Sequence, residues 1–154
     1  MDLGEFVTQE AIIPDLRVSS KKQLLQSIAE KASEQTGLSA RAIFDTILQR
    51  ERLGSTGVGK GIAIPHGKFA EVERIVGVFA RLHTPIEFEA LDDQPVDIVF
   101  LLLAPESAGA DHLKALSRIA RVLRDPVRIA NLRATADPEA LYSFLTREAT
   151  SNAA

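Results

Sequence analysis

The residue with the clearest chemical potential in this sequence is His66, which lies between Pro65 and Gly67. Proline stiffens the backbone on one side of the histidine, and glycine leaves little bulk on the other, so we expect the imidazole to be exposed. Near neutral pH an imidazole with an ordinary pKa of about 6.5 is largely uncharged, and one ring nitrogen offers a lone pair to a phosphoryl group. We therefore predict a nucleophilic His66; the alternative is a histidine that simply ends a strand.

The chain has two further histidines. His112 falls in the first turn of an expected helix that begins near Asp111, and two interpretations stay open. It is either a histidine at the edge of the core whose hydrogen bonds are made within the protein, or a hydrogen-bonding partner for a phosphate held on another residue. The second interpretation follows from the preference of helix N-termini for anions. His83 is expected to be a turn residue without a role. Since the histidines lack the spacing of a metal site, we expect no metal and no cofactor.

A glycine-rich loop, Gly54–Lys60, matches the phosphate-loop pattern Gly-x-x-x-x-Gly-Lys. Nucleotide binding is disfavoured, because Gly61 has no hydroxyl for magnesium and Pro65 lies where a helix should continue. The expected order, helix then loop then strand, is also the reverse of a phosphate loop. Two other interpretations remain: a chain reversal that needs positive φ, or a loop in which Ser55 and Thr56 approach a nearby anion.

Two helices are expected ahead of this loop. The first follows Ser20, which opens a capping-box pattern, and ends at Gly37. The second runs from Ser39 to about Leu53, with Gly54 as its C-terminal cap. Arg50 falls on the apolar stripe of this second helix, so we expect its guanidinium to lean inward at the helix end.

After the loop, the sequence predicts a short strand that ends at His66 and further strands at Ile75–Leu82, Ile86–Phe88 and Val96–Ala104. Helical patterns return at about 111–124, 126–133 and 138–147, the last two behind aspartate caps. This order of elements predicts an α/β fold: a single-domain sandwich over residues 1–154, with a central mixed β-sheet flanked by helices and a frayed tail from about residue 148.

Composition narrows the possible functions. The 154 residues are 45% apolar, which is enough material for one core, and the absence of cysteine excludes disulfides and thiolate chemistry. A net charge of −3 argues against nucleic acid as a partner. The longest apolar run, Ile98–Ala104, is too short for the roughly 20 residues that cross a bilayer. With no leader-like start, we expect a cytoplasmic protein without membrane insertion.

These residues carry a family resemblance. The segment GSTGVGKGIAIPHGK, Gly54–Lys68, preceded by Arg50-Glu51, resembles the active-site segment of enzyme IIA proteins of the fructose and mannitol class of the phosphotransferase system. VGVFARLHTPIEFEALDDQPVDIVFLLLAP and the later DHLKALSRIARVL extend the similarity over nearly the whole chain. The likeness is strongest to the nitrogen-regulatory branch, whose members occur as free-standing EIIA type-2 domains of about this size.

The resemblance implies a phosphotransferase component, a phosphoprotein in which His66 receives phosphoryl from a small histidine phosphocarrier protein that is itself fed by enzyme I. It aligns the family's active-site arginine with Arg50 and its second histidine with His112, and it makes Ser55 and Thr56 the loop hydroxyls that support the phosphate. Relatives usually carry the phosphoryl group on Nε2. The branch is thought to regulate target proteins according to phosphorylation state.

Two other functions stay open at this stage: a regulatory protein-binding module in which phosphorylation is secondary, and a IIA component that serves a sugar permease. Phe69 and Val72, beside the active loop, are expected either to be apolar contact points for partners or to belong to the core.

Overall fold

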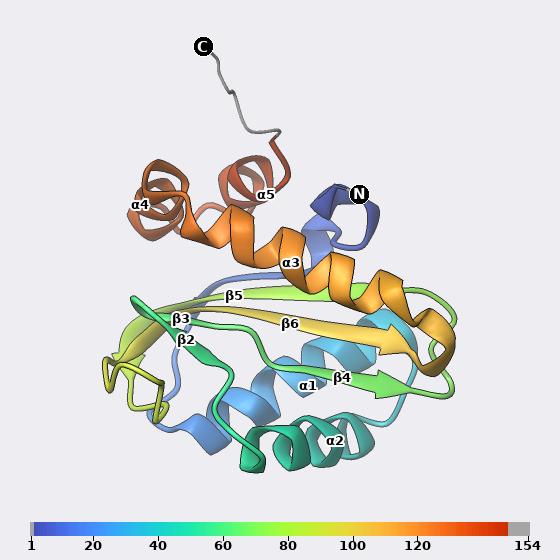
Figure 1. Ribbon diagram of the computed structural model, residues 1–154. Coiled ribbons are helices and arrows are strands. Elements are labelled where there is room, and N and C mark those ends of the chain that lie inside the picture. The colour runs from blue at the N-terminus through green and yellow to red at the C-terminus, as the bar shows by residue number, and fades with distance from the viewer. Residues whose placement is uncertain (1, 148–154) are drawn as a thin grey trace.

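The computed structural model describes residues 2–147 and shows a β-sheet between two helical layers (Figure 1). One face of the sheet is covered by α1 (Lys21–Thr36) and α2 (Ala40–Arg52), and the other by α3 (Ala110–Arg124), α4 (Pro126–Ala134) and α5 (Pro138–Thr146). The predicted α/β sandwich with a mixed sheet is confirmed. The predicted frayed tail lies outside the described residues.

The sheet has six strands in the order β1-β5-β6-β3-β2, with β4 also paired to β6. Their bounds are β1 (Ile12–Leu16), β2 (Gly57–Gly59), β3 (Ile62–Ala63), β4 (His66–Phe69), β5 (Val76–Ile86) and β6 (Val96–Pro105). β5 runs antiparallel to β6, whereas β3 and β4 run parallel to it. Central β6 is buried along almost its whole length, which is why its sequence is a continuous apolar run.

Most helix ends agree with the sequence signals, but the C-cap of α2 is Leu53 rather than the expected Gly54. The Ser20 hydroxyl accepts a hydrogen bond from the Gln23 backbone N–H, and Gly37 ends α1 in the left-handed conformation with φ of 79°. The carboxylates of Asp125 and Asp137 accept backbone N–H groups at the starts of α4 and α5. These caps therefore fix the two short helices that follow α3.

Several details of the sheet differ from the sequence prediction. The strand expected to end at His66 is instead two strands, since β3 ends at Ala63 and His66 begins β4. Strand β1 was not predicted, and the two strands expected at Ile75–Leu82 and Ile86–Phe88 form one strand that ends at Ile86. The pairing of β5 with β6 resumes at Ile86, after a shift in register between Arg81 and Ile86 that includes Pro85. The expectation of a turn at His83 was therefore wrong. His83 lies within β5, and its Nδ1 is 3.1 Å from the Asp15 carboxylate of β1.

The core settles one alternative that the sequence left open. Phe69 is 6% exposed and Val72 is 7% exposed, and both belong to the main apolar cluster. They are core residues rather than contact points for partners. Among residues 2–147, no helix is long and apolar enough to cross a membrane.

Candidate functional site

His66 is the first residue of β4, where it is registered against Leu102 of β6. Pro65 lies between β3 and β4, and its carbonyl accepts the Leu102 N–H at 3.0 Å. The segment between the two strands is therefore still hydrogen-bonded to β6. A Cβ atom on Gly67 would lie 3.1 Å from the Thr46 methyl of α2 and 3.2 Å from the Phe69 ring. Glycine thus allows β4 to lie close against α2.

The His66 ring is held in one orientation by its own loop. Its Nδ1 lies 2.8 Å from the carbonyl oxygen of Ile64. Because a carbonyl only accepts hydrogen bonds, Nδ1 carries the proton and donates it, and the neutral ring has its lone pair on Nε2. The geometry therefore makes Nε2 the nucleophilic atom of His66.

The surroundings of His66 keep this ring neutral. Burial lowers the pKa of His66 below its ordinary value, and the nearby Arg50 cation lowers it further. The hydrogen bond to Ile64 and the charge of Glu51 act in the opposite direction but do not reverse the shift. At neutral pH the imidazole is thus predominantly the unprotonated, nucleophilic form.

The second histidine lies against the first. The ring centroids of His66 and His112 are 5.7 Å apart, with 65° between the ring planes. His112 is 7% exposed, and burial lowers its pKa; positive charge on Lys68, or on His66 when that ring is protonated, acts in the same direction. Its Nε2 is buried without a hydrogen-bond partner among the described residues. An unpartnered buried nitrogen costs about 1–3 kcal/mol, so this atom is poised for an additional ligand.

Arg50 joins this pair from the last turn of α2. Its Nη1 donates to the Gly54 carbonyl at 2.9 Å, and the side chain is half-buried beside the glycine-rich loop. One guanidinium nitrogen therefore fixes the loop, while the remaining N–H groups are available to an anion near His66.

The loop hydroxyls take part in the loop's own structure. The Ser55 hydroxyl accepts the Gly57 N–H at 3.0 Å. The buried Thr56 hydroxyl donates to the carboxylate of Glu51, and the Thr56 N–H donates to the same carboxylate at 2.9 Å. The Thr56 proton is therefore already committed, whereas the Ser55 hydroxyl keeps a proton that it can donate.

Sequence reasoning missed Glu51. Glu51 is 6% exposed at the end of α2, and its carboxylate pairs with the Lys21 ammonium of α1 at 3.0 Å besides accepting both hydrogen bonds from Thr56. A signal was present: Glu51 follows Ile43 and Ile47 at intervals of four, which continues the buried stripe of α2. Glu51 thus ties the loop to both helices of one layer.

The glycine-rich loop has the context expected of a chain reversal. It follows α2 and opens into β2, and φ is positive at Gly54, Gly59 and Gly61. Lys60 also has a positive φ of 58°, and its N–H donates to the Asp92 carboxylate. Since a strand follows this loop rather than a helix, the structural context of a phosphate loop is missing.

Taken together, the site brings a neutral imidazole, a second histidine with a free nitrogen and a guanidinium cation from three separate elements to one place. Phosphoryl transfer depends chiefly on positioning and on compensation of spreading negative charge. A nucleophilic nitrogen beside such donors is suited to receive and hold a phosphoryl group.

Comparison with known proteins identifies the family to which the chain belongs. Residues 5–148 match the family model of the phosphoenolpyruvate-dependent sugar phosphotransferase system, EIIA 2. The chain is 60% identical over 145 residues to a nitrogen regulatory protein of Bradyrhizobium diazoefficiens, covering 94% of this chain and 95% of that protein. It is 44% identical over 155 residues to a nitrogen regulatory protein of Klebsiella oxytoca, covering 100% and 96%.

Among solved structures, the crystal structure of nitrogen regulatory protein IIA-Ntr from Neisseria meningitidis superposes with a TM-score of 0.89 at 36% identity, covering 94% of this chain and 99% of that one. The chain belongs to the EIIA type 2 family of the phosphotransferase system. Within that family it is a histidine phosphocarrier of the nitrogen-regulatory IIA-Ntr kind, and it exchanges phosphoryl with partner proteins of the system.

Proposed function

We propose that Nε2 of His66 is the atom that carries the phosphoryl group, and that the donor is a small histidine phosphocarrier protein charged by enzyme I. In the transfer, the P–N bond of the donor's phosphohistidine breaks as a new P–N bond forms at His66. The donor imidazole recovers its lone pair, so no further reactant is needed. The observation that carries the proposal is the 2.8 Å contact of Nδ1 with the Ile64 carbonyl, which leaves Nε2 as the free lone pair.

Arg50 and His112 take supporting roles in this proposal. The Arg50 guanidinium offers charge-assisted hydrogen bonds, worth about 1.5–3 kcal/mol each, to the phosphoryl oxygens. Nε2 of His112 would find its missing hydrogen-bond partner in an oxygen of the phosphoryl group on His66. The Ser55 hydroxyl can donate a further bond, whereas Thr56 acts through Glu51 on the shape of the loop.

The proposed physiological role is regulation of target proteins according to phosphorylation state. A phosphoryl group adds close to two negative charges, and charge of that size alters a protein interface by electrostatics alone. The relatives named as nitrogen regulatory proteins match this chain over almost their whole length, which supports regulation over service to a sugar permease. Because phosphoenolpyruvate is a metabolite of the cell interior, the role places the protein in the cytoplasm.

The test is phosphorylation with phosphoenolpyruvate, enzyme I and the small phosphocarrier, followed by intact-mass and acid-lability analysis. Wild type should gain one acid-labile phosphoryl group and His66→Ala none. The matched control is His83→Ala, since His83 is a histidine of the same chain that pairs with Asp15 outside the site. Full labelling of His66→Ala would refute the assignment, and loss of labelling in His83→Ala would place the acceptor elsewhere.

A further inference from the structure

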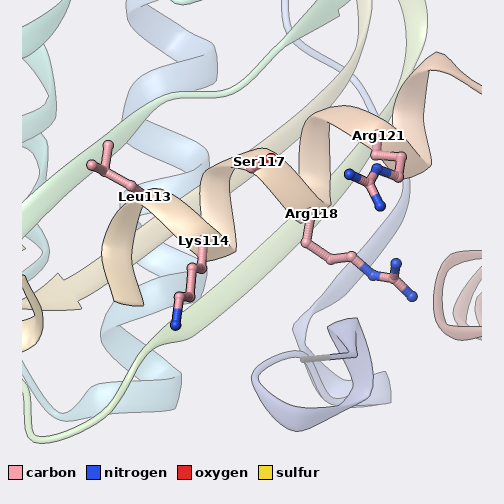
Figure 2. Close-up of a pocket in the computed structure, with 5 residues that line it drawn as sticks. All are labelled: Leu113, Lys114, Ser117, Arg118 and Arg121. Atoms are coloured by element: carbon pink, nitrogen blue, oxygen red, sulfur yellow. The ribbon is translucent and has the colours of Figure 1, made fainter. Parts of the chain in front are cut away.

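Helix α3 has an outward side that the site does not use. Its exposed or half-exposed residues Leu113, Lys114, Ser117, Arg118 and Arg121 line a shallow groove of about 490 Å³. We call these five residues the α3 face. Figure 2 shows their side chains along the helix, with the two arginines at the end away from Leu113.

The charged residues of helix α3 are mostly of one sign. Helix α3 contains four basic residues and a single acidic one, Asp111 in its first turn, although the whole chain has a net charge of −3. On α3, Asp111 lies within one turn of Lys114 but forms no ion pair with it, whereas elsewhere such neighbours do pair, as in Lys31–Glu34 and Arg41–Asp45. Like charges three or four residues apart destabilise a helix by a few tenths of a kcal/mol, so this arrangement is costly unless an anion faces it.

The cations of the α3 face have few partners among the described residues. Within residues 2–147, Lys114 and Arg121 form no ion pair, and Arg118 has one weak contact, from Nη2 to the Asp2 carboxylate at 3.4 Å. The Nε of Arg118 is buried and has no hydrogen-bond partner in the described part of the chain, so an external carboxylate would meet the terminal guanidinium nitrogens of Arg118 instead. The α3 face therefore has cationic donors in excess of its acceptors.

The α3 face also carries an apolar anchor. Leu113 is 69% exposed and directly follows His112, the residue that touches the His66 ring. A protein that reaches His66 covers roughly 800 Å² on each side, so it extends over neighbouring residues such as Leu113. A groove that is apolar at the end near the site and cationic beyond it suits an amphipathic acidic segment better than a small ion.

We propose that the α3 face docks an acidic segment of a partner protein, with an apolar side chain of that segment on Leu113 and its carboxylates on Lys114, Arg118 and Arg121. This inference rests on the proposed function only in taking partner proteins to approach the His66 end of α3. The test of docking uses unphosphorylated protein, so its outcome is independent of whether phosphoryl transfer occurs.

The probe is a fluorescein-labelled amphipathic helical peptide whose charged residues are all glutamate, with leucines on the other side. The control peptide has lysine in place of every glutamate. Fluorescence anisotropy should show binding of the acidic peptide alone, weakening as salt concentration rises. In ¹H–¹⁵N spectra of the whole chain, the amide shifts should concentrate on residues 113–121.

The decisive comparison is between two charge reversals of equal size. Lys114→Glu/Arg121→Glu should weaken peptide binding by about tenfold, equivalent to about 1.4 kcal/mol. Lys22→Glu/Arg41→Glu changes the net charge equally on the opposite helical layer and should leave the affinity within about twofold. Circular dichroism of both variants verifies that each is folded.

Three results would overturn the proposal. The first is equal weakening in both variants, and the second is a set of amide shifts outside α3. The third is binding of inorganic phosphate to the same residues with no added affinity from the peptide, which would indicate a small-anion site instead.

Discussion

Glu51 provides the sharpest test of how the loop is held. Its buried carboxylate accepts two hydrogen bonds from Thr56 and pairs with Lys21 at 3.0 Å. Hydrogen bonds to a charged group are worth about 1.5–3 kcal/mol each, and removing one partner of a buried pair costs about 3–5 kcal/mol. The Lys21 side chain is 21% exposed and recovers part of its hydration. We therefore expect Glu51→Ala to lower the free energy of unfolding by about 3–4 kcal/mol.

The measurement is urea unfolding at equilibrium, with Glu51→Gln as a milder variant that keeps one acceptor oxygen for Thr56. The matched control is Glu89→Gln, because Glu89 also approaches Lys21, at 3.8 Å, but is 85% exposed. The exposed pair should contribute less than about 1 kcal/mol. Glu51→Gln and Thr56→Val together should show a coupling energy of about 1–2 kcal/mol in a double-mutant cycle.

Equal effects of Glu51→Gln and Glu89→Gln, or additive effects of Glu51→Gln and Thr56→Val, would refute this reasoning. Either result would mean that the loop is held by its glycine conformations rather than by the buried carboxylate.

Two further predictions concern transfer. Arg50→Ala should slow phosphoryl uptake in stopped-flow experiments more than His112→Ala does, because the guanidinium cation pairs its charge with the phosphoryl oxygens whereas the imidazole donates as a neutral group; the reverse order would contradict the proposed roles. The rate of phosphoryl uptake should be independent of pH at and above neutrality and should fall only in acid, below the ordinary histidine pKa of about 6.5. Burial and the Arg50 cation lower the pKa of His66, and protonation of the ring removes the lone pair that attacks phosphorus. A rate that rises on acidification, measured with a donor whose own profile is known, would be inconsistent with a neutral nucleophile.

Most of the fold could be predicted because its signals are local. The caps at Ser20, Gly37, Asp125 and Asp137 act within a few residues, and the apolar run of β6 reports burial on both faces. Strand β1 has no such signal. It is a short edge strand containing Pro14, and it exists through its parallel pairing with β5, a long-range contact that no local pattern encodes.

In the site, too, features with a local sequence signal could be predicted and features that depend on long-range contacts could not. The sequence indicates His66 through its neighbours and Arg50 through helical spacing, but it gives no orientation for the imidazole. The bond from Nδ1 to Ile64 depends on how the chain bends at Pro65, and the contact with His112 depends on the packing of α3 over the sheet. Glu51 was missed because a carboxylate at a helix end is ordinarily solvated; its burial requires Lys21 from another helix.

The position of β4 explains why both helical layers can serve one histidine. β4 lies off the main strand path and pairs only with β6 among the described strands, so His66 begins a strand at an open edge of the sheet. At an edge, groups from either face can reach the same point: Arg50 comes from α2 on one side and His112 from α3 on the other. A histidine inside a central strand would present its ring to one layer only, because alternate side chains face opposite sides. The edge location therefore offers the proposed phosphoryl acceptor two sources of stabilising groups, one from each helical layer.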